Sequence, residues 1–195
     1  MRHSRSSLAV SSNSPAAPRA LQPAGEGSYQ LRAAAGKLRR DRVCGRAAAL
    51  PGAQLDDAKL LHDGIRFGKG LQLVNVLRDL PADLRHGRCY LPQRELEAIG
   101  LSADELLDPE NEPKLRPLYE TLLRRAEDDL RAGWDYTKAL PRSCIRVRQA
   151  CAWPILIGVR TLAKLRKHNV LDSSQRIKIS RKEVKQIIAR SILSY

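Results

Sequence analysis

The sequence predicts an all-α protein, and three observations carry that prediction. Apolar residues recur every three or four positions over several long stretches from Leu55 onward. Pro81, Pro113 and Pro141 stand near the starts or ends of these stretches, where helices tolerate proline best, and Pro154 is expected to interrupt and bend one of them. No segment shows the sustained alternation of apolar and polar residues that is typical of strands.

The first periodic stretch predicts a helix from Leu55 to about Asp83, with Pro81 kinking its last turn. A loop with Gly87 follows, and then two short helices. The second of these spans 102–107, where Ser102 and Glu105 form a capping box.

Three longer helices complete the prediction. Pro113 fits the first turn of a helix over 113–139, which Pro141 closes. The next helix, 143–167, is apolar almost all round between 150 and 162, so we expect it to be buried among other helices. The last, 180–193, is amphipathic and basic.

Residues 1–50 differ from the rest of the chain. They are rich in Ser, Ala, Pro, Gly and Arg and show no hydrophobic period, so they predict a largely disordered basic leader. A transit peptide is the alternative interpretation of this segment. The helical domain is accordingly predicted over residues 51–195.

The net charge of +14 is unevenly distributed. Residues 1–50 carry nine basic and two acidic side chains, 51–141 carry 13 and 17, and 142–195 carry 13 and two. The two basic ends suit phosphate, an anionic membrane surface or an acidic substrate. The acidic centre and an aromatic content of only 4% argue against a nucleic-acid partner.

Composition also bears on the cellular location. The four cysteines form no Cys-x-x-Cys pair, which favours a reducing compartment over a disulfide framework. No apolar run approaches the roughly 18 residues of a membrane span. We therefore expect a cytoplasmic protein whose contact with membranes, if any, is peripheral; the oligomeric state stays open.

Polar side chains line one side of the first predicted helix. At 100° per residue, Gln72, Asn75, Asp79 and Asp83 fall within roughly an 80° sector. Their neighbours are apolar, so we expect this stripe to be buried, and a buried carboxylate needs a partner. Mg²⁺ meets that need, because it takes oxygen ligands from one or two carboxylates together with phosphates.

A second Asp-x-x-x-Asp pair, Asp104 and Asp108, lacks the accompanying amides. It lies on a short predicted helix that Pro109 ends. We expect it to be a solvated surface feature.

The stripe and the loop after it resemble the second aspartate-rich motif of the squalene and phytoene synthases, Q-x-x-N-x-x-R-D-x-x-x-D-x-x-x-G-R-x-Y-x-P. The matching positions are Gln72, Asn75, Arg78, Asp79, Asp83, Gly87, Arg88, Tyr90 and Pro92. A weaker resemblance continues through Gly133–Tyr136, Arg148–Pro154 and Arg176–Arg181. It covers about residues 51–195, which look like the C-terminal part of such an enzyme.

This resemblance implies a partial isoprenoid (terpenoid) synthase helical bundle. It implies a prenyltransferase of isoprenoid biosynthesis that joins two prenyl diphosphates, farnesyl or geranylgeranyl, head to head. Mg²⁺ is the implied cofactor, and NADPH is added if the reaction is of the squalene type.

The resemblance also implies residue roles. Asp79 and Asp83 would be catalytic and, with Asn75, would hold the metal. Gln72, Asn75, Arg78, Arg88 and Arg176 would bind diphosphate, as would Lys178 and Arg181. Three alternatives stay open: a structural salt bridge for Arg78, a solvated basic tail for Arg176, Lys178 and Arg181, and for Tyr90 a loop anchor instead of a catalytic contact with the carbocation.

Family members carry another aspartate-rich motif on a facing helix. Residues 1–78 contain no Asp-x-x-x-Asp, so we expect this sequence, as a fragment of the fold, to supply one wall of a two-walled site. Whether it is active in this form stays open. The alternative function is a catalytically inactive helical module that binds anionic membranes through its basic C-terminal helix.

Overall fold

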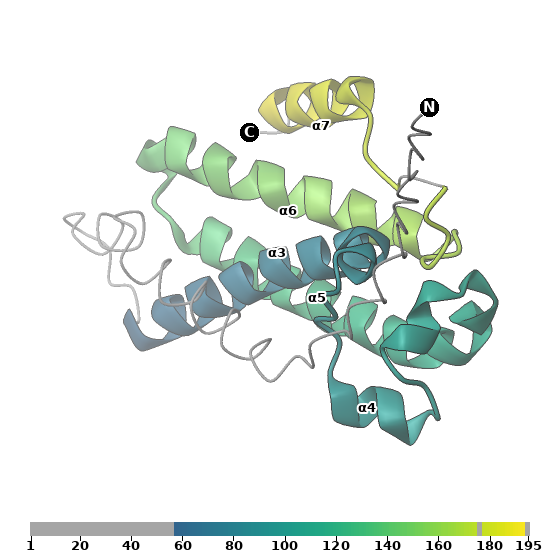
Figure 1. The fold of residues 1–195 in the computed structure, drawn as a ribbon. Coiled ribbons are helices and arrows are strands. Elements are labelled where there is room, and N and C mark those ends of the chain that lie inside the picture. Colours follow the sequence, from purple (N-terminus) through teal and green to yellow (C-terminus); the bar gives the residue numbers. More distant parts are fainter. Residues whose placement is uncertain (1–56, 175–176, 194–195) are drawn as a thin grey trace, which may run out of the picture.

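The computed structural model describes residues 57–174 and 177–193, so the predicted leader 1–50 and Arg176 lie outside it. Every regular element in the described ranges is a helix, which confirms the all-α prediction (Figure 1). In chain order the elements are α3 (Asp57–Arg85), α4 (Gln93–Ala98), η1 (Asp104–Leu107), η2 (Pro109–Asn111), α5 (Glu112–Ala139), η3 (Arg142–Cys144), α6 (Ile145–Leu165) and α7 (Arg181–Leu193).

Helices α3 and α5 form an antiparallel pair at the centre of the fold. A Cβ added at Gly70 would lie 2.9 Å from the Cβ of Asp129, and one added at Gly133 would lie 2.5 Å from the ring of Phe67. These glycines let the two backbones approach where a larger residue would overlap. Arg66 adds a hydrogen bond across the pair, with its Nε 2.9 Å from Oδ1 of Asp129.

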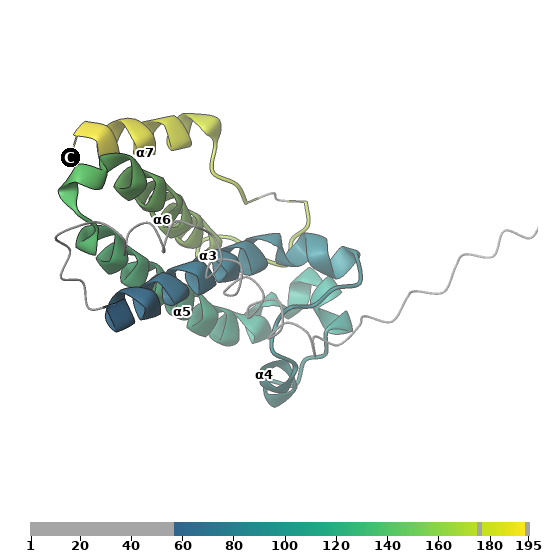
Figure 2. The same cartoon turned by 90° about the vertical axis from the view of Figure 1, so that its left-hand side faces the viewer.

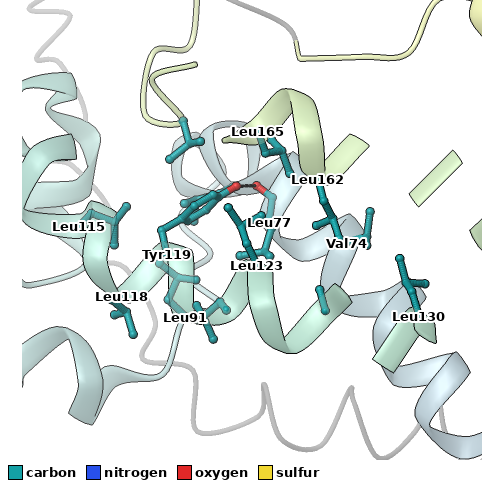
Figure 3. Packing of buried hydrophobic residues seen from close by; sticks show 14 of the residues in the cluster. Val74, Leu77, Leu91, Leu115, Leu118, Tyr119, Leu123, Leu130, Leu162 and Leu165 are labelled. Carbon is teal, nitrogen blue, oxygen red and sulfur yellow. Dashed lines mark hydrogen bonds between the residues drawn. The ribbon is translucent and has the colours of Figure 1, made fainter. Parts of the chain in front are cut away.

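Helix α6 packs against both members of this pair. A Cβ at Gly158 would lie 2.9 Å from Leu130 of α5, and Leu162 and Leu165 are fully buried beside Leu77 (Figure 3). The expectation that α6 is buried among other helices holds for one side of it only, because Val159 is 42% exposed. Among the described residues, other helices cover only part of its circumference.

Pro81 interrupts the hydrogen-bond ladder of α3. Proline has no N–H, so the carbonyl of Leu77, four residues earlier, loses its helical donor. The hydroxyl of Tyr119 on α5 supplies a replacement and donates to that carbonyl at 2.9 Å (Figure 3). Both side chains are fully buried, and burial raises the pKa of the Tyr119 hydroxyl above its ordinary range.

Helix α7 lies along α6, as both views show (Figures 1 and 2). Near its end, the indole N–H of Trp153 donates to Oγ of Ser191 at 3.0 Å. At its start, Ser180 and Glu183 form a capping box: the Ser180 N–H donates to the Glu183 carboxylate at 2.8 Å, and the Glu183 N–H donates to Oγ of Ser180 at 3.2 Å. None of the helices in the described ranges has the length and apolar character needed to cross a membrane.

Candidate functional site

The predicted polar stripe lies on the side of α3 that α5 and α6 leave uncovered. Val74, Leu77 and Leu80 turn into the core, whereas Asn75 is exposed. The side chain of Asp79 is 43% exposed and that of Asp83 is 21% exposed. The expectation of a buried stripe is therefore wrong, because the apolar residues beside it pack to one side of the helix only.

Asp79 is held by its sequence neighbour Arg78. The Arg78 Nε donates to Oδ1 of Asp79 at 2.9 Å, and its Nη2 donates to Oδ2 at 2.6 Å. This hydrogen bonding raises the pKa of Arg78. Arg78 thus forms the salt bridge that was the alternative interpretation, and its guanidinium group contacts both carboxylate oxygens of Asp79.

Asp83 lies one turn further along α3 and pairs with Arg88, whose Nη2 is 3.7 Å from its Oδ1. Burial raises the pKa of Asp83, and the charge of Asp79 raises it further, while Arg88 opposes the shift. The loop is fixed to this turn, since the Arg88 N–H donates to the Asp83 carbonyl at 2.9 Å. Gly87 makes the return possible with φ at 72°, in the left-handed region that glycine adopts easily.

A cavity of about 270 Å³ opens beside Asp79. Three cationic side chains line it: Arg78 and Arg85 from α3, and Lys178 from the segment before α7. That segment is held in place by two long-range hydrogen bonds, from Arg85 to the Ser173 carbonyl at 3.5 Å and from Lys164 to the Lys178 carbonyl at 3.1 Å.

Arg85 is a candidate that the sequence motif did not indicate. It follows Arg78 by seven residues, which places both on one side of the helix. That spacing was a usable signal. The resemblance had named Lys178 as a diphosphate contact, and Lys178 lines this cavity, but its place across from Arg78 and Arg85 could not be predicted from spacing, because a segment without regular structure carries it there.

The remaining predicted residues are more scattered. Gln72 and Tyr90 are half-buried, and Arg181 is exposed at the start of α7. Their roles stay predictions, as do those of the motif carboxylates. Asp104 and Asp108 are exposed, as expected, and Asp108 caps η2 by accepting from the Glu110 N–H at 3.0 Å.

The arrangement can bind an anion through its cations and a cation through its carboxylates. No group of three or more His, Cys, Asp or Glu side chains that could hold a metal occurs in the described part of the chain. Asp79 and Asp83 are nevertheless one helical turn apart, Asn75 is one turn before Asp79, and these residue types fit Mg²⁺. This ion commonly takes one or two carboxylates and completes its shell with water and phosphate oxygens.

The fold and this motif define a helical protein with an aspartate-rich, cation-lined site, and sequence comparison gives its family. The chain belongs to the squalene/phytoene synthase family, whose model matches residues 42–183. Similar proteins include a 15-cis-phytoene synthase of Enterobacter agglomerans, 31% identical over 61% of this chain and 38% of its own length. Another is a 15-cis-phytoene synthase of Synechocystis, 30% identical over 48% of this chain and 26% of its own. A chloroplastic phytoene synthase of an Oncidium hybrid is 27% identical over 56% and 25% respectively. The matches thus span between about a quarter and two-fifths of these relatives.

Proposed function

We propose that this chain supplies one wall of a Mg²⁺-dependent prenyltransferase site that joins two prenyl diphosphates head to head. The observation that carries the proposal is the cavity in which Asp79 lies among Arg78, Arg85 and Lys178. Family membership and the phytoene synthases among the relatives favour geranylgeranyl diphosphate as substrate.

The chemistry requires charge stabilisation on the leaving group. Ionisation breaks the bond between the allylic carbon and its oxygen, and the bonding electron pair stays on the diphosphate. The forked guanidinium groups of Arg78 and Arg85 match phosphate oxygens in geometry, and Lys178 adds a third positive charge. These groups stabilise the charge as it develops.

Asp79 and Asp83 would hold the metal, with Asn75 beside them. When bound, Mg²⁺ supplies Lewis-acid stabilisation of the diphosphate oxygens. Arg78 engages both oxygens of Asp79. The proposal therefore requires Arg78 to turn from the carboxylate to the diphosphate when the site is loaded.

Two measurements test the proposal. Calorimetry should detect binding of pyrophosphate to the purified chain that depends on Mg²⁺, and incubation with geranylgeranyl diphosphate should show whether pyrophosphate is released. Asp79→Asn and Asp83→Asn should each weaken Mg²⁺-dependent binding at least about tenfold, the order expected when one ligand of a hydrogen-bonded charge site is lost. Asp104→Asn, an exposed aspartate outside the site, is the matched control.

The calorimetric measurement of pyrophosphate binding tests the proposed metal site even if the chain releases no pyrophosphate from geranylgeranyl diphosphate. If pyrophosphate binds equally well with and without Mg²⁺, or if Asp104→Asn weakens binding as much as Asp79→Asn, the proposed metal site is wrong.

A further inference from the structure

A second and larger cavity, of about 630 Å³, lies between the end of α5, the part of α6 from Arg148 to Arg160 and the part of α7 from Glu183 to Ser191. Its lining shares no residue with the cavity beside Asp79. The volume falls within the roughly 300–1,000 Å³ that is usual for sites of small organic ligands. The proposed prenyltransferase site gives this cavity no task.

The walls of the cavity are apolar. Trp134 of α5, Leu156 and Val159 of α6, and Ile187 of α7 contribute them. Val159 is 42% exposed although it is aliphatic, so this wall is open to solvent. An alkyl chain lying against it would remove that apolar surface from water.

The mouth of the cavity is cationic. Arg160 and Arg190 line the cavity and are exposed, and Arg148, which is half-buried, and Lys138, at the end of α5, line it too. Lys138 has a surface partner in Asp135, at 2.8 Å.

The cavity has one acidic lining residue, Glu183. Its carboxylate accepts from Nζ of Lys164 at 2.8 Å and from the Ser180 N–H at 2.8 Å. These interactions lower the pKa of Glu183 to about 2. Its charge is thus already matched by Lys164, and the basic residues that line the cavity outnumber this single acidic one.

The positive charge continues along α7 beyond the cavity. Lys182, Gln186 and Arg190 are spaced by four residues and so follow one side of the helix, the last two inside the cavity and the first beyond it. Arg181 and Lys185 are exposed next to them. A small soluble anion would need only the mouth, whereas a charged surface bearing lipid headgroups would contact the whole row.

We propose that this cavity binds an anionic phospholipid at a membrane surface. The phosphate lies at Arg160 and Arg190, one acyl chain lies along Trp134, Leu156 and Val159, and the exposed cations of α7 rest on neighbouring headgroups. This proposal gives the membrane binding that the sequence suggested as an alternative function a defined lipid site. The lipid site and the proposed prenyltransferase site would then occur on the same chain.

The test is co-sedimentation of the full chain with vesicles of phosphatidylcholine and with vesicles that also contain phosphatidylglycerol. Binding should require the anionic lipid. Arg160→Glu should lower the affinity roughly tenfold or more, since each basic group near an anionic surface contributes about a factor of five and reversal also adds repulsion. Val159→Gln, which removes apolar wall without changing charge, should lower it roughly threefold.

Arg146→Glu is the matched control, because Arg146 is an exposed arginine of the same helix outside the cavity. It should change the affinity less than about threefold, as expected for a charge away from the bound surface. Equal losses for Arg146→Glu and Arg160→Glu would show attraction by net charge only and would overturn the proposal. So would unchanged binding of Val159→Gln, or full competition by inorganic phosphate.

Circular dichroism and thermal unfolding should be unchanged in all three variants, since each position is exposed. Mg²⁺-dependent binding of pyrophosphate should also be unchanged in them. If the lipid site is wrong, the prenyltransferase proposal therefore still stands. Likewise, if Asp79→Asn and Asp83→Asn leave Mg²⁺-dependent pyrophosphate binding unchanged, the lipid proposal still stands.

Discussion

Replacing Tyr119 by Phe should destabilise the fold through a single hydrogen bond. The variant keeps the buried ring but removes the hydroxyl that donates to the Leu77 carbonyl at 2.9 Å. Pro81 has already taken that carbonyl's helical donor, and the surroundings are fully buried, so water cannot replace it. A buried acceptor left unsatisfied costs about 1–3 kcal/mol.

The free energy of unfolding should accordingly fall by about 2 kcal/mol in urea titrations followed by circular dichroism. For a chain of this size, the thermal midpoint should fall by roughly 4–8 °C. The dependence of the unfolding free energy on urea concentration should not change, because the native chain and the variant expose nearly the same surface on unfolding.

Pro81→Ala provides the internal control. Alanine restores an N–H that can donate to the Leu77 carbonyl, so Tyr119→Phe should cost less in that background. The double-mutant cycle should show a coupling of about 1 kcal/mol. Additive effects, or a cost of Tyr119→Phe below about 0.5 kcal/mol in the native background, would refute the reasoning.

Gly133→Ala should destabilise by about 1–3 kcal/mol despite the better helix propensity of alanine, because its Cβ would lie 2.5 Å from the ring of Phe67; a more stable variant in urea titrations would contradict this. Because the fold raises the pKa of the Asp83 carboxyl, the folded state binds its proton more tightly than the unfolded state does. The stabilisation from this proton is full below the ordinary pKa of 3.8 and is lost as the pH rises through the pKa of the folded state. Asp83→Asn should therefore be more stable than the native chain at neutral pH, with an advantage that shrinks on acidification; an advantage independent of pH would exclude this cause. For Glu183 the sign is opposite, because its ionised carboxylate stabilises the fold: this stabilisation is full above pH 4.5 and is lost as the pH falls towards 2. Lys164→Met should bring the pKa of the Glu183 carboxyl, measured by NMR, back towards 4.5. An unchanged titration in Lys164→Met would show that Lys164 does not cause the shift.

Local signals in the sequence predicted the helices well. The stretch expected over 113–139 is observed as Glu112–Ala139, and that over 180–193 as Arg181–Leu193. Proline placement and apolar spacing act within one or two turns, so a single stretch of sequence contains them. The capping box of Ser102 and Glu105 is present too, with the Ser102 N–H 2.7 Å from the Glu105 carboxylate.

Long-range features were beyond the reach of those signals. Apolar neighbours suggested a buried stripe on α3, but periodicity cannot say which side of a helix a distant segment covers. Lys178 lines the cavity beside Asp79 only because the segment before α7 returns to the end of α3, whereas Arg85 is on α3 itself. The role of Tyr119 likewise depends on a contact across 42 positions of the chain.

The two sides of α3 carry separate tasks. On one side of α3, Gly70, Leu77 and Leu80 fix how the helix packs in the core against α5. On the other side, Asn75 and Asp79 lie away from that contact. Substitutions on the outer side can therefore alter what the protein binds with little effect on whether it folds. A lineage of such proteins could change ligand by altering a few outward residues and keep its scaffold intact.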